Sequence, residues 1–95
     1  MGLTPLDSAL TGSLLSDPDS LALLDDRACL AAMLRVEAAL AVAQGRLGLI
    51  PADAADRIAA VAAGLDLDPA VLAEGSADAG VPVPALVAQL RAAVR

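Results

Sequence analysis

The sequence predicts an all-α chain of four to five helices. No stretch alternates apolar and polar residues as a strand would, whereas apolar residues recur at spacings of three and four. Asp-Pro pairs and glycines stand where such helices would begin and end. The chain has 95 residues, enough for one domain over residues 1–95, and 24 of them are Ala and 18 are Leu, which suits tightly packed helices.

Residues 1–16 show no sustained period, and we expect them to form an extended arm ahead of the helices. Thr, Ser, Gly and Pro interrupt this segment. Its leucines would be costly to leave in water. We therefore expect the following leucines to pack against another surface: Leu3, Leu6, Leu10, Leu14 and Leu15.

The main helix is expected over residues 26–47, after a short helix over residues 18–24. Asp17 followed by Pro18 is typical of a helix start, because the Asp side chain caps free backbone N–H groups and Pro needs no donor there. Asp25 and Asp26 provide the next cap, and Gly48 ends the main helix. Apolar spacings of 4, 3, 4, 3 and 4 predict the core stripe of this helix, a seam that packs on another helix. The seam residues are Cys29, Met33, Val36, Leu40, Ala43 and Leu47.

Three further helices are expected over residues 51–63, 69–79 and 84–95. Residues 81–84 read Val-Pro-Val-Pro and predict a stiff extended linker, because a residue before proline avoids the helical region. The last apolar pattern is still running at Arg95, so we expect this chain to be a fragment of a longer one. In the first of these helices we expect an apolar stripe of Ala54, Ile58, Val61 and Leu65 and an outer ion pair of Asp53 and Arg57. We expect Asp68 to cap the second helix and Gly80 to end it. The last helix has an apolar face of Leu86, Val87, Leu90 and Val94.

The composition argues against several classes of function. A net charge of −6 without aromatic residues disfavours contacts with phosphates and bases, so no nucleic-acid partner is expected. The chain has one cysteine and no histidine, which excludes an internal disulfide, a Cys-based zinc site and histidine-dependent triads. Apolar runs reach about eight residues where a membrane span needs roughly 20. We expect a cytoplasmic protein with no membrane partner, no metal and no cofactor.

A first candidate site is Ser20, because Asp19-Ser20-Leu21 resembles the prosthetic-group motif of acyl carrier proteins. Such a carrier domain has a full helix and a long loop before this serine, and here only 19 residues precede it. A helix start explains the same residues. A second candidate is Glu37, which flanks the predicted seam together with Gln44 and is either a site carboxylate or a polar residue at a helix interface.

The remaining candidates have simpler structural explanations. Calcium loops contain alternating acids, but they also need a glycine and a final glutamate at fixed positions, which are missing here. Of the acids concerned, Asp17, Asp19, Asp25 and Asp26, helix caps account for Asp17 and for Asp25 or Asp26. Cys29 lies on the seam and is expected to be a small buried residue. We assign no catalytic, cofactor-binding or metal-binding residue to this chain.

Two runs of the chain resemble the N-terminal segment of the fumarase/aspartase superfamily, in which Val-Glu-x-Ala-Leu-Ala-x-Ala-Gln ends in Leu-Gly-x-Ile-Pro. The first run is Val36-Glu37-Ala38-Ala39-Leu40-Ala41-Val42-Ala43-Gln44, and the second is Leu47-Gly48-Leu49-Ile50-Pro51. Within the superfamily the chain looks most like the 3-carboxy-cis,cis-muconate cycloisomerases, also through Ala79-Gly80-Val81-Pro82 and the residues up to Leu90. It departs from that pattern at Val81, where Asn is common, and at Ala85, where Pro is common. Adenylosuccinate lyases carry an Arg-Tyr pair for the nucleotide phosphate where Leu14 and Leu15 stand, so the resemblance disfavours a nucleotide substrate.

The resemblance implies the N-terminal helical domain of a helical-bundle enzyme. Members are homotetramers without metal or organic cofactor, and their active sites combine regions from three subunits. Their catalytic serine loop reads like Gly-Ser-Ser-x-Met-Pro-x-Lys-x-Asn, and this chain has neither Lys nor Asn. The resemblance thus implies a parent enzyme that lactonises 3-carboxy-cis,cis-muconate in aromatic catabolism, a tricarboxylate substrate, and a 95-residue chain that is inactive alone.

Two alternatives stay open beside the cycloisomerase. The first is a free-standing acidic helical module that dimerises through the Met33–Leu47 seam. The second is a fragment of an adenylosuccinate lyase-like or other lyase of the same superfamily.

Overall fold

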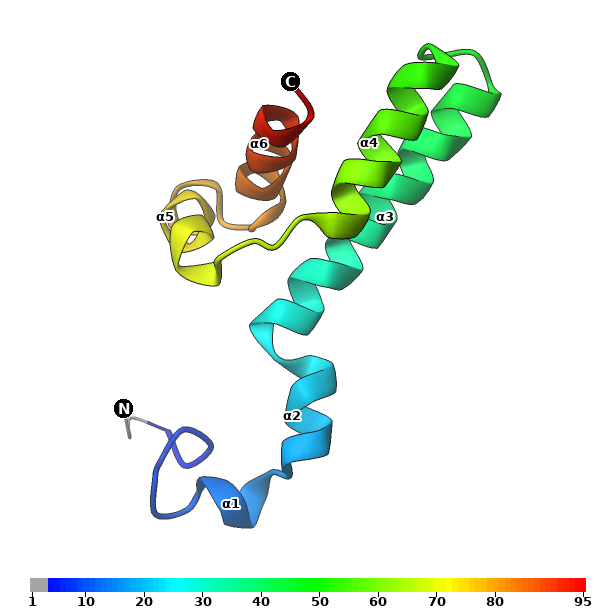
Figure 1. Cartoon of the computed structure of the whole chain (residues 1–95). Helices are drawn as coiled ribbons and strands as arrows, with labels where there is room; N and C mark the ends of the chain where they lie inside the picture. Colours follow the sequence, from blue (N-terminus) through cyan, green and yellow to red (C-terminus); the bar gives the residue numbers. More distant parts are fainter. Residues whose placement is uncertain (1–3) are drawn as a thin grey trace.

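The structure is a computed structural model, and it describes residues 4–95. These residues form helices and no strand, which confirms the all-α fold class. The main helix, α3 (Asp26–Arg46), runs antiparallel beside α4 (Ala52–Gly64), and α5 (Pro69–Ala79) and α6 (Val83–Val94) pack against this pair. Two short helices, α1 (Gly12–Leu15) and α2 (Pro18–Leu24), lead away from it toward the N-terminus (Figure 1).

Three of the predicted helix starts are confirmed by their capping bonds. The Asp17 side chain accepts a hydrogen bond from the Ser20 backbone N–H at 2.9 Å, and Asp25 accepts one from Ala28 at the same distance. Asp68 caps α5 by accepting from the Ala70 N–H at 3.0 Å. These bonds satisfy donors that a first helical turn leaves free, so short local motifs were enough to place the helices.

Glycines end two helices as predicted. Gly48 and Gly80 have φ angles of 74° and 79°, a left-handed conformation that side chains with a Cβ rarely adopt. The Gly80 N–H donates to the Ser76 carbonyl at 2.8 Å and so closes the last turn of α5. The turn after Gly48 then sends α4 back along α3.

Two local predictions were wrong. The arm is not fully extended, because residues 12–15 form the single helical turn α1. The Val-Pro-Val-Pro segment is not a stiff linker either, since α6 already begins at Val83 and takes Pro84 into its first turn. Proline is tolerated there because first-turn N–H groups have no partner inside the helix.

The core lies where α3, α4, α5 and α6 meet. Leu86 of α6 is fully buried, and the neighbouring core residues are leucines and one alanine: Leu30, Leu34, Ala62, Leu67, Leu72 and Leu90. The predicted stripes of α4 and α6 are confirmed in part, since Ile58, Val61, Leu65, Val87 and Val94 are half-buried and pack against this core.

The predicted seam of α3 was wrong as a core element. Leu30, Leu34 and Ala41 are its buried residues, one position along from the seam, which is about 100° around the helix. Val36, Leu40 and Leu47 are exposed at 66%, 50% and 76%. Cys29 is exposed as well, which corrects the expectation of a buried cysteine.

Close contact between helices explains this choice of face. A Cβ built on Gly45 would lie 2.6 Å from the Ala55 Cβ, so α3 and α4 approach each other through small residues. Ala41, Ala55 and Ala62 are buried along the same contact. Large side chains on the seam would not allow such an approach, and they are left outside.

The N-terminal segment does not pack on the body. The radius of gyration is 16.6 Å, against about 12 Å for a compact chain of this length. The longest dimension is 53 Å because α1 and α2 project from the other helices (Figure 1). Leucines 6, 10, 14 and 15 are exposed within this chain, while Leu3 lies outside the described residues.

Candidate functional site

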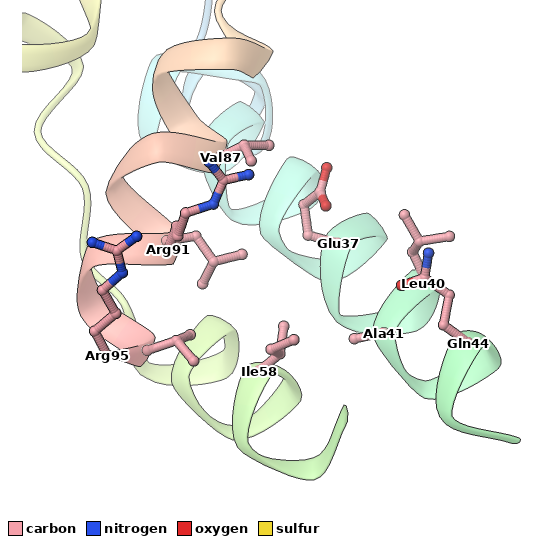
Figure 2. A pocket seen from close by; sticks show the side chains of 10 residues that line it. Glu37, Leu40, Ala41, Gln44, Ile58, Val87, Arg91 and Arg95 are labelled. Carbon is pink, nitrogen blue, oxygen red and sulfur yellow. The ribbon is translucent and has the colours of Figure 1, made fainter. Parts of the chain in front are cut away.

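A cleft of about 360 Å³ opens between α3, α4 and α6. Its apolar floor includes Ile58 and Leu90, and Glu37 and Gln44 of α3 lie on one side of it. Arg91 of α6 stands on the other side (Figure 2). The structure therefore brings together the two polar residues singled out beside the seam, and it adds two arginines, Arg91 and Arg95.

Helical spacing accounts for the placement of the two α3 residues. Glu37 and Gln44 are seven residues apart, two turns of one helix, so they point to the same side. Both are half-buried, and Leu40 lies between them at the rim of the cleft. Arg91 was missed in the sequence, because nothing local shows that its turn of α6 comes to lie opposite Glu37.

The cleft combines an apolar lining with a few polar side chains. Its lining consists of one carboxylate, one amide, two arginines and apolar side chains, with no hydroxyl, thiol, imidazole or amine group. Glu37 is therefore the one side chain of this lining that could act as a base or a nucleophile. The cleft can hold an apolar surface with polar groups at its rim.

Ser20 acts in a helix cap in this structure. Its hydroxyl donates to Asp17 Oδ2 at 2.7 Å while its backbone N–H donates to Oδ1. These two bonds lower the pKa of Asp17 from its ordinary value, the hydroxyl having the larger effect. The helix-start interpretation of Asp19-Ser20-Leu21 is confirmed.

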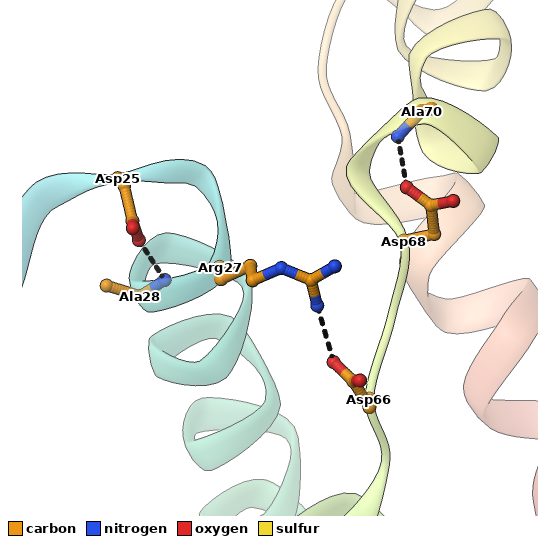
Figure 3. Close-up of polar contacts among 6 residues, drawn as sticks. All are labelled: Asp25, Arg27, Ala28, Asp66, Asp68 and Ala70. Atoms are coloured by element: carbon orange, nitrogen blue, oxygen red, sulfur yellow. Dashed lines mark hydrogen bonds and ion pairs between the residues drawn. The ribbon is translucent and has the colours of Figure 1, made fainter. Parts of the chain in front are cut away.

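At the start of α3, Asp25 caps the helix, Asp26 lies in the first turn and Arg27 forms an ion pair. Among residues 4–95, no three potential ligands gather as a metal site would require. Arg27 Nη1 lies 2.9 Å from Asp66 Oδ1, which ties the start of α3 to the loop before α5 (Figure 3). The expected pair of Asp53 and Arg57 is not formed; both side chains are exposed, where such pairs contribute little.

One stretch, Pro18–Arg46, is long and apolar enough to cross a membrane by length and composition alone. Asp25 divides it into two helices. Its least charged part is residues 28–45, whose two charged residues, Arg35 and Glu37, lie near the middle. Charges at that depth are costly in lipid. The expectation of no membrane partner stays a prediction.

Comparison with known proteins finds similarity to a lyase. The chain is 42% identical over 74 residues to N-acetyl-S-(2-succino)cysteine lyase of Enterococcus italicus. The match spans 78% of this chain and 16% of that enzyme. It supports a place in the fumarase/aspartase superfamily. The relative is a lyase, so the match supports an enzymatic parent without supporting the cycloisomerase in particular. No family model matches the chain.

Proposed function

We propose that this chain is the N-terminal helical segment of a fumarase/aspartase-superfamily lyase that acts on a substrate with two or more carboxylates. The 42% identity over 74 residues carries the proposal. The relative's name describes a thioether substrate whose succinyl group bears two carboxylates. In this proposal the segment is a scaffold, and catalytic groups come from other parts of a cytoplasmic homotetramer that needs no cofactor.

A 3-carboxy-cis,cis-muconate cycloisomerase is the second candidate for the parent enzyme. The segment Ala79-Gly80-Val81-Pro82 and the residues up to Leu90 favour it, through their likeness to that family. Both candidate reactions make or break a bond from carbon to a heteroatom while a proton moves at the neighbouring carbon. They differ in the heteroatom, which is sulfur for the lyase and a carboxylate oxygen for the cycloisomerase.

Assay of the natural full-length protein with both substrates tests these proposals. Under the lyase proposal, N-acetyl-S-(2-succino)cysteine is cleaved and releases a free thiol that can be titrated. Under the cycloisomerase proposal, 3-carboxy-cis,cis-muconate loses its conjugated-diene absorbance. The 95-residue chain is the matched control, and we expect no turnover of either compound. Turnover by the short chain, or by neither protein, contradicts the proposal.

A further inference from the structure

The exposed seam of α3 is an apolar surface that the fold of this chain does not cover. Its residues are the six of the predicted seam, Cys29, Met33, Val36, Leu40, Ala43 and Leu47, of which Met33 alone also packs against the core. We infer that a helix from the part of the parent enzyme outside these 95 residues lies along this seam. The inference rests on the proposed function, because it needs a parent longer than this chain.

The composition of α3 is that of a helix with neighbours on all sides. Residues 28–45 include only two charged side chains, Arg35 and Glu37. Helices that are apolar around their whole circumference lie inside large proteins or cross membranes, whereas a surface helix has one polar face. Within the part of the chain that the structure describes, only three of the 21 residues of α3 are buried. The outer side of α3 therefore lacks the neighbour that its composition predicts.

The uncovered surface continues from α3 onto α2. A hollow of about 440 Å³ lies where the two helices meet. Leu23 and Leu24 of α2, exposed at 77% and 81%, line it together with Cys29 and Ala32 of α3. From Cys29 to Leu47 the seam adds about 27 Å at 1.5 Å per residue, with the spacing that keeps two helices in contact. The surface thus has room for a covering helix of about five turns.

The match to the lyase of Enterococcus italicus favours a cover from the same polypeptide. A stretch of 74 residues within a chain of 95 includes residues 22–74 wherever it starts, so α3 lies within the match. The match is 16% of that enzyme, so the counterpart of α3 belongs to a chain with more than four fifths of its length outside the match. Longer chains bury a larger fraction of their surface than a chain of 95 residues does.

A second copy of this chain is a poorer cover, because like charges meet in either orientation. Each copy has a net charge of −6. In an antiparallel pair centred between Val36 and Leu40, the two Glu37 side chains come close together. In a parallel pair the equal ends of α3 meet instead, Asp26 beside Asp26 and Arg46 beside Arg46. Like charges and parallel helix dipoles both weaken such a contact, and a covering helix of different sequence avoids them.

Glu37 defines the chemistry of the covering helix. Its side chain is half-buried beside the seam, and it has no ion-pair partner among residues 4–95. A Lys or Arg on the covering helix would meet this carboxylate at the edge of the apolar contact, where an ion pair is stronger than in water. We expect a helix with apolar residues at steps of three and four and one basic residue beside Glu37.

Labelling of Cys29 with a thiol reagent tests the inference, because this seam residue is exposed within the chain. The rate is measured by peptide mass spectrometry in the 95-residue chain and in the natural full-length protein, both folded. We expect labelling at least tenfold slower in the full-length protein, and equal rates after unfolding in urea. Equal rates in the folded proteins overturn the inference. Protection of the short chain that grows with its concentration would indicate a second copy and overturn it as well.

A matched pair of valines gives a second readout. Val36 and Val71 are exposed at 66% and 59%, on and off the seam. In the short chain we expect Val36→Glu and Val71→Glu to leave the melting temperature nearly unchanged, since both valines face solvent there. In the full-length protein Val36→Glu should lower it by about 5 °C or more relative to Val71→Glu, because it places a charge under the covering helix. Equal shifts of both variants in the full-length protein contradict the inference.

The failure of this inference is distinguishable from failure of the proposed function. Labelling and melting need no catalytic activity, so a protected Cys29 in a full-length protein that turns over neither substrate supports the cover and contradicts the lyase. Turnover of N-acetyl-S-(2-succino)cysteine together with equal labelling rates contradicts the cover alone. A natural product with an intact mass of 9.4 kDa, that of this chain, contradicts the longer parent on which both depend.

Discussion

The helix α3 carries two apolar stripes, and only one of them builds the fold. The inner stripe of Leu30, Leu34 and Ala41 is buried against α4 and the core. The outer seam has more regular spacing and comparable side chains, yet Leu40 is 50% exposed and Leu47 is 76% exposed. Regular spacing thus identifies a surface suited to another helix without telling whether that helix belongs to the same chain.

The difference comes from the partner helix rather than from α3. α4 presents small residues, Ala55 and Ala62, and a helix of this kind packs most closely where its neighbour is small too. Gly45 and Ala41 are the small residues on the inner side of α3 that allow this close packing.

The largest effect is expected at Leu86, the one fully buried leucine among the core residues. Leu86→Ala removes packing at the centre of the cluster and should cost about 2–5 kcal/mol of unfolding free energy. Leu24→Ala on the projecting α2, where the side chain is largely exposed, should change it by less than about 0.5 kcal/mol. Urea unfolding measures both, and similar losses would mean that the core is misplaced.

The contact between α3 and α4 is tested by two glycine substitutions of opposite expected sign. Gly45→Ala places a Cβ 2.6 Å from the Ala55 Cβ, so the helices must separate, at a cost of about 1–3 kcal/mol. Gly64→Ala meets nothing within 4 Å and should stabilise the chain by up to about 1 kcal/mol through helix propensity. Thermal melts of the two variants decide. Stabilisation by both would contradict the close approach.

Local features of the fold followed from the sequence because their causes are local. Asp17, Asp68 and Gly80 each act on their own helix end, over two to four residues. Local sequence could not predict which face of α3 is buried, because that choice depends on the residues of α4, which pack against α3 only after the chain has turned. A search for small residues facing small residues, such as Gly45 and Ala55, is the signal that would have found it.

The candidate site was predictable to a smaller extent. Glu37 and Gln44 were found because both flank one stripe of a single helix. Arg91 and the cleft itself depend on how α6 sits across α3 and α4, and that arrangement joins residues more than 40 positions apart in the sequence. The bridge from Arg27 to Asp66 spans 39 residues and has no local signature either.

The smallest effect is expected from the cap of α2, far from both stripes. Asp17→Ala should lower helicity in residues 18–24 alone, whereas Asp19→Ala, which removes no capping bond, should change it less. The folded-state pKa of Asp17 is lowered, so the cap is complete above the ordinary aspartate pKa of about 3.9 and is lost as the pH falls through the lower folded value. NMR titration of the Ser20 amide follows this loss. An amide shift that titrates above the ordinary pKa would contradict the assignment.

Two leucine substitutions on α3 test most directly that this helix uses one stripe and leaves the other free. Leu34 is 4% exposed on the inner stripe, and Leu40 is 50% exposed on the outer seam, six residues away. Unfolding free energies of Leu34→Ala and Leu40→Ala are compared at concentrations where the chain is monomeric. The account predicts a loss of about 2–5 kcal/mol for Leu34→Ala and a clearly smaller one, below about 1 kcal/mol, for Leu40→Ala. A loss at Leu40 equal to or greater than that at Leu34 would contradict it.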